Sequence, residues 1–187
     1  MNEASPALQH LRGVFDTPTL AHLDAQCRPE RMPLVPLRTA LDDALAASGV
    51  TDAAAVKVRC AALWWHDHLE ESHALSQELE GDDGSFLHGL MHRREPDYSN
   101  AKYWFHRVGT HPAYPEIARR AGPLLQASPA LREALLDGTR WDPIAMIDAV
   151  AEAVAEAVAG PRTADAYRRL QQVQRVELDA LLVRFCA

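Results

Sequence analysis

The sequence predicts an all-α fold, a single-domain irregular helical bundle with a long central helix and short helices bounded by proline and glycine. Apolar residues recur at helical spacing over most of the 187-residue chain, with capping residues, prolines and glycines where those stretches begin and end. The chain holds no run of alternating β-branched residues bounded by hairpin turns. Its composition, 48% hydrophobic and 24% charged, is that of a globular domain with its own core.

At the N-terminal end, several prolines and weak periodicity mark residues 1–35, which we expect to form an arm packed on the bundle. The first regular helix is predicted over residues 37–48, and a glycine ends it. Thr51 or Asp52 then caps a long helix over residues 52–80, which stops at the sequence GDDG. This long helix is expected to form the centre of the bundle.

Shorter helices follow, each with its own boundary signals. Ser85 caps a helix over residues 85–95, which ends because the residue before Pro96 is disfavoured in the α conformation. The remaining helices are predicted over residues 101–108, 116–126 with a break at Gly122-Pro123, 130–137, 144–159, and 164–185 after a Thr163 cap. The alanine-rich helix 144–159 and the amphipathic last helix are candidates for a homodimer seam, although core packing explains both equally well.

Composition and charge exclude several classes of function. We expect no signal peptide and no membrane span, because no stretch approaches the ~18–20 consecutive apolar residues that a span needs. A net charge of -7 at pH 7 argues against nucleic-acid binding, since phosphate backbones require a basic face. The three cysteines, Cys27, Cys60 and Cys186, are odd in number and far apart, which indicates neither a disulfide framework nor a CxxC metal site. We therefore expect a cytoplasmic protein with reduced, buried cysteines.

Histidines concentrate in the middle of the chain: seven of the nine lie within residues 66–111, where even spacing would place about two. On a continuous helix 52–80, a polar stripe about 60° wide would contain His66, Glu70, His73 and Gln77. The next helix carries a similar stripe at positions i, i+4 and i+7, made of His88, His92 and Glu95. Two helices joined by the short GDDG turn are expected to pack as an antiparallel pair. Their stripes would then meet around one polar interior pocket, closed by the segment 97–111.

Three interpretations of this pocket stay open. In the first, neutral imidazoles and carboxylates bond to each other in a structural polar core, which avoids a penalty of ~1–3 kcal/mol for each unpaired buried group. In the second, the side chains bind a metal ion. In the third, the site is metal-free, histidine moves protons and arginine holds an anion.

The metal interpretation rests on ligand spacing. Histidines at i and i+4 on a helix bind one ion together, and Glu70 and His73 form a Glu-x-x-His pair, a ligand arrangement of bundle cores. A di-iron centre needs this pair twice, and the chain has no second copy, so we expect a single divalent ion, zinc, iron or manganese. The candidate metal ligands are His66, Glu70, His73, His88 and His92. The doublet His66-Asp67 is also similar to that of the helical, metal-dependent HD phosphohydrolases.

A catalytic set and a ligand-binding set follow from these interpretations. The catalytic candidates, as metal ligands, proton carriers or a general base, are His73, His88, His92 and Glu70. The residues expected to hold and orient a small anionic ligand are Arg93, Tyr98, Asn100, Tyr103 and Arg107. On an ideal helix, however, Arg93 and Arg94 point away from the histidine stripe, and pairing with acids on a neighbouring helix is the alternative. Core packing for the tyrosines and helix capping for Asn100 are alternatives of the same kind.

The block HGLMHRREPDYSNAKYWFHRVGTHP, preceded by LEESHALSQELEGDDGSFL, resembles a family of small bacterial all-helical proteins with no assigned activity. The resemblance covers about residues 63–120 and implies that the histidines and arginines named above belong to the family's characteristic block. It implies no substrate, cofactor or catalytic residue. From the residue chemistry, we predict an enzyme that performs hydrolysis or acid–base chemistry on a small anionic metabolite. The alternative is a non-catalytic ligand-binding or interaction protein whose histidine cluster is a structural polar core.

Overall fold

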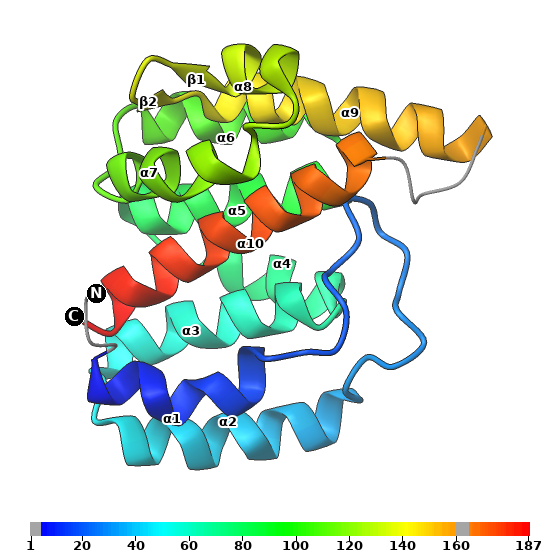
Figure 1. Cartoon of the computed structure of the whole chain (residues 1–187). Coiled ribbons are helices and arrows are strands. Elements are labelled where there is room, and N and C mark those ends of the chain that lie inside the picture. Colours follow the sequence, from blue (N-terminus) through cyan, green and yellow to red (C-terminus); the bar gives the residue numbers. More distant parts are fainter. Residues whose placement is uncertain (1–4, 160–164) are drawn as a thin grey trace.

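The computed structural model describes residues 5–159 and 165–187 and confirms the all-α class (Figure 1). Over these residues the chain forms ten helices and one two-stranded antiparallel sheet. The helices are α1 (Pro6–Phe15), α2 (Leu34–Ser48), α3 (Asp52–Trp65), α4 (Leu69–Gln77), α5 (Gly81–Arg94), α6 (Tyr98–Val108), α7 (Tyr114–Leu124), α8 (Pro129–Leu135), α9 (Pro143–Ala159) and α10 (Asp165–Phe185), and the strands are β1 (Leu136–Asp137) and β2 (Arg140–Trp141).

The last helix holds the two sides of the bundle together. Helices α1, α2 and α3 lie on one side and α6, α7 and α9 on the other, and α10 crosses between them in contact with α3, α7 and α9 (Figure 1). One hydrophobic cluster runs from Leu11 of α1 to Phe185 of α10 and includes the fully buried Trp65. Burial of this apolar surface is the main force that holds the helices in place.

The long helix predicted over residues 52–80 is wrong, because the chain breaks at residues 66–68 and forms α3 and α4 instead. Asp67 has a φ of 64°, in the left-handed region, which ends the first helix. Its carboxylate accepts hydrogen bonds from Arg28 and Arg94, which come from other parts of the chain. These buried ion pairs hold Asp67 in a conformation that a continuous helix does not allow.

Helix α5 begins at Gly81, four residues before the predicted start at Ser85, so the GDDG sequence is its first turn and not a connecting loop. Two aspartates in that first turn favour this start, since negative charge is stabilising at a helix N-terminus. Further along, a Cβ atom added to Gly89 would lie 2.7 Å from the ring of Phe105. The missing side chain therefore lets α5 and α6 approach closely, and this contact places their polar residues side by side.

The other helix boundaries match the predictions to within a few residues, with local exceptions. Gly122-Pro123 does not break α7, which runs through to Leu124. The predicted helix 130–137 loses its last two residues to β1. Asp97, with its side chain bonded to the backbone N–H of Asn100, caps α6. The predicted Thr163 cap and residues 1–4 of the arm lie outside the described residues.

The N-terminal segment contains helix α1, which was not predicted as a regular helix. Helix α1 packs on α2, and the following loop buries Ala21, Leu23 and Arg28. None of the described helices is both long enough and apolar enough to cross a lipid bilayer.

Candidate functional site

Three of the predicted histidines meet where α4 packs against α5. His73 comes from α4, and His88 and His92 stand one turn apart on α5. The ring centroids of His73 lie 5.0 Å from His88 and 4.9 Å from His92, and those of His88 and His92 lie 4.8 Å apart. One ring nitrogen from each of the three lies within 4.8 Å of the other two. This arrangement, the histidine cluster, brings three candidate metal ligands together, and small ring movements that shorten the nitrogen separations to below about 4.2 Å are needed for one ion to bind all three.

The histidine cluster is closed on one side and open on the other. His88 and His92 are only 4% and 5% exposed, whereas 27% of the His73 side chain is accessible. A ligand would therefore approach along the side of α4 that carries His73. A largely enclosed site with one accessible edge is the usual form of a small-ligand or metal site.

Polar neighbours orient two of the three rings. The side-chain nitrogen of Gln77 lies 2.9 Å from Nε2 of His73, and that of Asn100 lies 3.0 Å from Nε2 of His92. His88 differs, because its buried Nδ1 has no hydrogen-bond partner among the residues that the structure describes. An unsatisfied buried nitrogen costs free energy in a purely structural core, but His66 Nδ1 and Arg93 Nε are also unpaired among the described residues. The unpaired nitrogen of His88 therefore favours a ligand only together with the convergence of the three rings.

A carboxylate that was not among the predicted site residues stands beside the cluster. One oxygen of Glu95 lies 3.5 Å from Nδ1 of His92, and the other lies 4.0 Å from Nδ1 of His73. Burial raises the pKa of Glu95, and its side chain is still 33% exposed. The sequence places Glu95 at i+7 from His88 on the same stripe. The Glu-x-x-His spacing nevertheless favours Glu70 as the predicted carboxylate of the site.

The protonation state of the cluster suits a metal ligand. Burial, together with the neighbouring His92 and His73, lowers the pKa of His88 to about 4. Burial also lowers the pKa of His92, with His73 acting in the same direction. Both rings are therefore neutral at pH 7, and the neutral imidazole is the form that binds metal ions.

A stack of flat groups extends from the cluster to the surface. The ring of Trp104 lies parallel to His88 at a centroid distance of 4.0 Å, and the guanidinium of Arg107 lies over Trp104 at 5.0 Å. Arg107 is exposed and donates a hydrogen bond of 3.3 Å to the hydroxyl of Tyr103, itself 53% exposed. Trp104 thus contacts both His88 of the cluster and an exposed cation.

The structure does not bring His66 or Glu70 to the cluster. Nε2 of His66 lies 2.7 Å from the backbone oxygen of Val14, on the opposite side of the helix break. Glu70 is exposed and has no hydrogen-bond or ion-pair partner among the described residues. The turn at Asp67 removes the alignment of His66 with His73, whereas Glu70 stays on α4 with His73 but faces solvent.

Arg93 is also absent from the cluster, which corrects its predicted role as an anion holder. Its guanidinium is fully buried and forms a two-pronged ion pair with Glu177 of α10, at 3.0 and 2.5 Å. Tyr98 is half-buried with a hydroxyl that has no hydrogen-bond partner in the described part of the chain. Of the predicted ligand-binding residues, Asn100 contacts the cluster, Arg107 reaches it through Trp104, and Tyr103 contacts both Trp104 and Arg107.

Asp67, without its neighbour His66, belongs to a second buried polar cluster with Arg28 and Arg94, which we call the Asp67 network. Asp67 accepts hydrogen bonds from Nε of Arg28 at 2.9 Å and from a terminal nitrogen of Arg94 at 2.7 Å. The remaining guanidinium nitrogens bond to backbone oxygens, including that of Trp64 at 2.6 Å. Burial alone would raise the pKa of Asp67, but these cations outweigh burial, and the pKa is lowered. Asp67 therefore holds the helix break in place.

The predicted interior pocket is not an empty chamber between the stripes. The three imidazoles contact each other directly, edge to face or stacked. Two surface hollows of about 370 and 410 Å³ lie elsewhere, and neither is lined by a residue of the histidine cluster. Any ligand of the cluster thus binds at its accessible edge or between the ring nitrogens.

Comparison with known proteins identifies no relative. The chain matches no protein-family model, no curated protein sequence and no solved structure.

Proposed function

We propose that His73, His88 and His92 bind a single divalent metal ion, zinc, iron or manganese. The observation that carries this proposal is the convergence of three ring nitrogens within 4.8 Å, one from each residue, at a site where Nδ1 of His88 has no other partner among the described residues. Three histidines that leave a coordination position open are the ligand set of catalytic metal sites. Because the imidazoles of His88 and His92 are neutral at pH 7, no proton has to leave them before the metal binds.

Glu95 and Asn100 are the supporting residues in this proposal. Each stands within hydrogen-bonding or ion-pair distance of a ring of the cluster, so each orients a ligand or adds to its basicity. In this proposal Glu95, and not Glu70, serves as a fourth ligand or as a base for a bound water. Because its pKa is raised, this carboxylate gains and loses its proton at a pH closer to neutral.

We further propose hydrolysis or acid–base chemistry on a small anionic metabolite. A bound divalent ion lowers the pKa of a water molecule and so supplies a nucleophile at neutral pH. Arg107 stands over Trp104, which stacks on His88, and its exposed guanidinium suits a carboxylate or a phosphate next to the metal. Tyr103 holds that guanidinium through its hydroxyl.

Metal content tests the first part of the proposal. Untagged protein should carry about one zinc, iron or manganese ion per chain by elemental analysis, and chelator-stripped protein should rebind one in a competition titration. His92→Ala should abolish this binding, and Glu95→Gln should weaken it about 10–100-fold. His106→Ala is the matched control, because His106 is an exposed histidine on α6 outside the cluster. A stripped protein that rebinds none of the three metals contradicts the proposal.

Turnover tests the second part separately. Metal-loaded protein should hydrolyse at least one member of a panel of phosphate and carboxylate esters, and the stripped protein should not. Arg107→Gln should raise KM more than it lowers kcat, because Arg107 holds the anion and does not contact the metal. If the metal-loaded protein turns over no member of the panel, the second part of the proposal is wrong and only the metal-binding part stands.

A further inference from the structure

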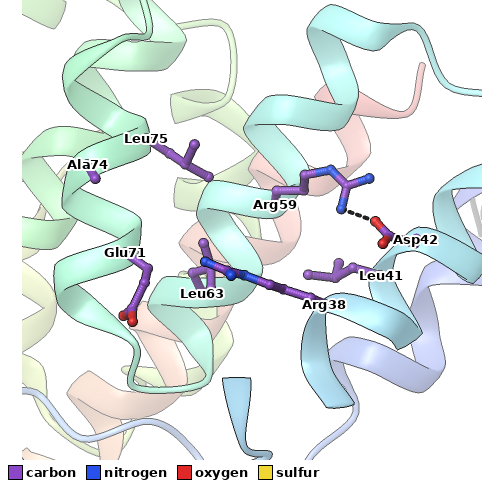
Figure 2. A pocket seen from close by; sticks show the side chains of 8 residues that line it. All are labelled: Arg38, Leu41, Asp42, Arg59, Leu63, Glu71, Ala74 and Leu75. Carbon is purple, nitrogen blue, oxygen red and sulfur yellow. Dashed lines mark hydrogen bonds and ion pairs between the residues drawn. The ribbon is translucent and has the colours of Figure 1, made fainter. Parts of the chain in front are cut away.

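A second candidate site lies on the opposite side of α4 from the histidine cluster. A hollow of about 370 Å³ opens between α2, α3 and α4 (Figure 2). Glu71 faces this hollow, and His73 is two residues away, which on an α-helix corresponds to about 200° of rotation. The hollow is therefore separate from the histidine cluster, and inferences about it do not depend on the metal proposal.

The floor of the hollow is apolar. Leu41 of α2 and Leu63 of α3 are almost fully buried beneath it, and Leu75 of α4 points across toward α3 (Figure 2). A volume of this size lies within the range of small-molecule sites and exceeds what one water molecule fills. An aliphatic group of four or five carbon atoms placed on these leucines would remove its apolar surface from water, which favours binding.

The rim carries two opposite charges that are not paired with each other. Arg59 and Asp42 form an ion pair at 2.5 Å, which neutralises both. Arg38 reaches from α2 over Leu63 toward α4, where Glu71 stands on the other side of the hollow (Figure 2). Among the described residues, neither Arg38 nor Glu71 has a hydrogen-bond or ion-pair partner. One free cation and one free anion thus flank an apolar floor.

We propose that this hollow binds a free α-amino acid with an aliphatic side chain. Arg38 receives the α-carboxylate, Glu71 receives the α-ammonium, and the side chain packs on Leu41, Leu63 and Leu75. A guanidinium suits a carboxylate because its two N–H groups match the two oxygens. The net charge of the rim is zero, which complements a zwitterion and penalises a ligand with a single charge.

Three ligands of the same shape test the charge pairing. Binding is followed by isothermal titration and by amide NMR shifts at residues of α2 and α4, with L-leucine, 4-methylpentanoate, which lacks the amine, and 3-methylbutylamine, which lacks the carboxylate. L-Leucine should bind, and each analogue should bind about tenfold more weakly or worse, because a charged hydrogen-bond partner is left unpaired. If millimolar leucine produces no saturable shift, the proposal is wrong. Equal binding of leucine and 4-methylpentanoate also overturns it, since Glu71 then has no role.

Variants locate the ligand in this hollow. Arg38→Gln and Glu71→Gln should each weaken leucine binding about tenfold or more, and Ala74→Phe should block it by filling the hollow. All three positions lie at the surface or rim, so circular dichroism and the melting temperature should stay as in the wild type. Arg12→Gln and Glu133→Gln remove the same charges at exposed positions away from the hollow and should leave binding unchanged. Undiminished leucine binding by folded Ala74→Phe protein contradicts the assigned location.

Discussion

The Asp67 network and the histidine cluster are both buried polar groups at the centre of the bundle, yet their bonding differs. In the Asp67 network, both carboxylate oxygens and all the guanidinium nitrogens of Arg28 and Arg94 have partners within the chain. In the histidine cluster, His88 has a buried Nδ1 with no partner among the described residues. A network whose groups are all paired stabilises a fold without a ligand, whereas an unpaired buried nitrogen within a cluster of three imidazoles favours a binding site.

The largest expected effect is the loss of the Asp67 network. Asp67→Ala leaves the guanidiniums of Arg28 and Arg94 buried without their common anion, and we expect the free energy of unfolding to fall by about 3–5 kcal/mol. Urea denaturation measures this loss. The control is Asp42→Ala, which removes an exposed ion pair with Arg59 and should cost less than about 1 kcal/mol. Equal losses in the two variants would show that the network does not support the helix break.

The same substitution in two histidines should separate structure from function. His111 is bonded through both ring nitrogens, to Asp83 at 3.1 Å and to the backbone N–H of Ala113 at 3.2 Å. His111→Phe should therefore lower the free energy of unfolding by about 1–3 kcal/mol. His88→Phe keeps the ring stacked on Trp104 and removes an unpaired nitrogen, so the metal-free protein should lose no stability or gain some. A comparable loss in both variants favours the structural polar core.

A smaller effect is expected in the pH dependence of stability. Because the pKa of His88 is about 4 in the folded protein, the unfolded chain takes up this proton first as the pH falls from 6.5. The free energy of unfolding of the metal-free wild type should therefore decrease as the pH falls from 6.5 to about 4. His88→Phe lacks this contribution, so the stability difference between variant and wild type should shift in favour of the variant, by at most ~1.4 kcal/mol per pH unit. Parallel pH profiles, measured in urea with a chelator present, would contradict the lowered pKa.

The fold class and most helix ends were predictable because their causes are local. Caps, prolines and glycines act on their own turn of the chain, as Asp97 does at the start of α6. The break at residues 66–68 was not predictable from local sequence, because Arg28 and Arg94, which hold Asp67, are 39 and 27 residues away along the chain. The buried ion pair of Arg93 was not predictable for the same reason, because its partner, Glu177, is distant in the sequence.

For the site, the part of the histidine cluster that could be predicted rests on spacing within one helix. His88 and His92 share a face of α5 because they are four residues apart, and this holds whatever the rest of the chain does. His73 meets them because α4 packs on α5, although the helix that was expected to align it with His66 is broken. The stacking of Trp104 on His88 was not predictable, because it depends on the close contact between α5 and α6.

The most direct measurement is a zinc titration of the chelator-stripped protein followed by the imidazole ¹H–¹⁵N NMR signals of all its histidines. If the histidine cluster binds the metal, the signals of His73, His88 and His92 change together and saturate at about one ion per chain, while those of His111 and the exposed His106 stay in place. Unchanged signals from the three residues at excess zinc would contradict the metal site and leave the cluster as a structural feature of the bundle.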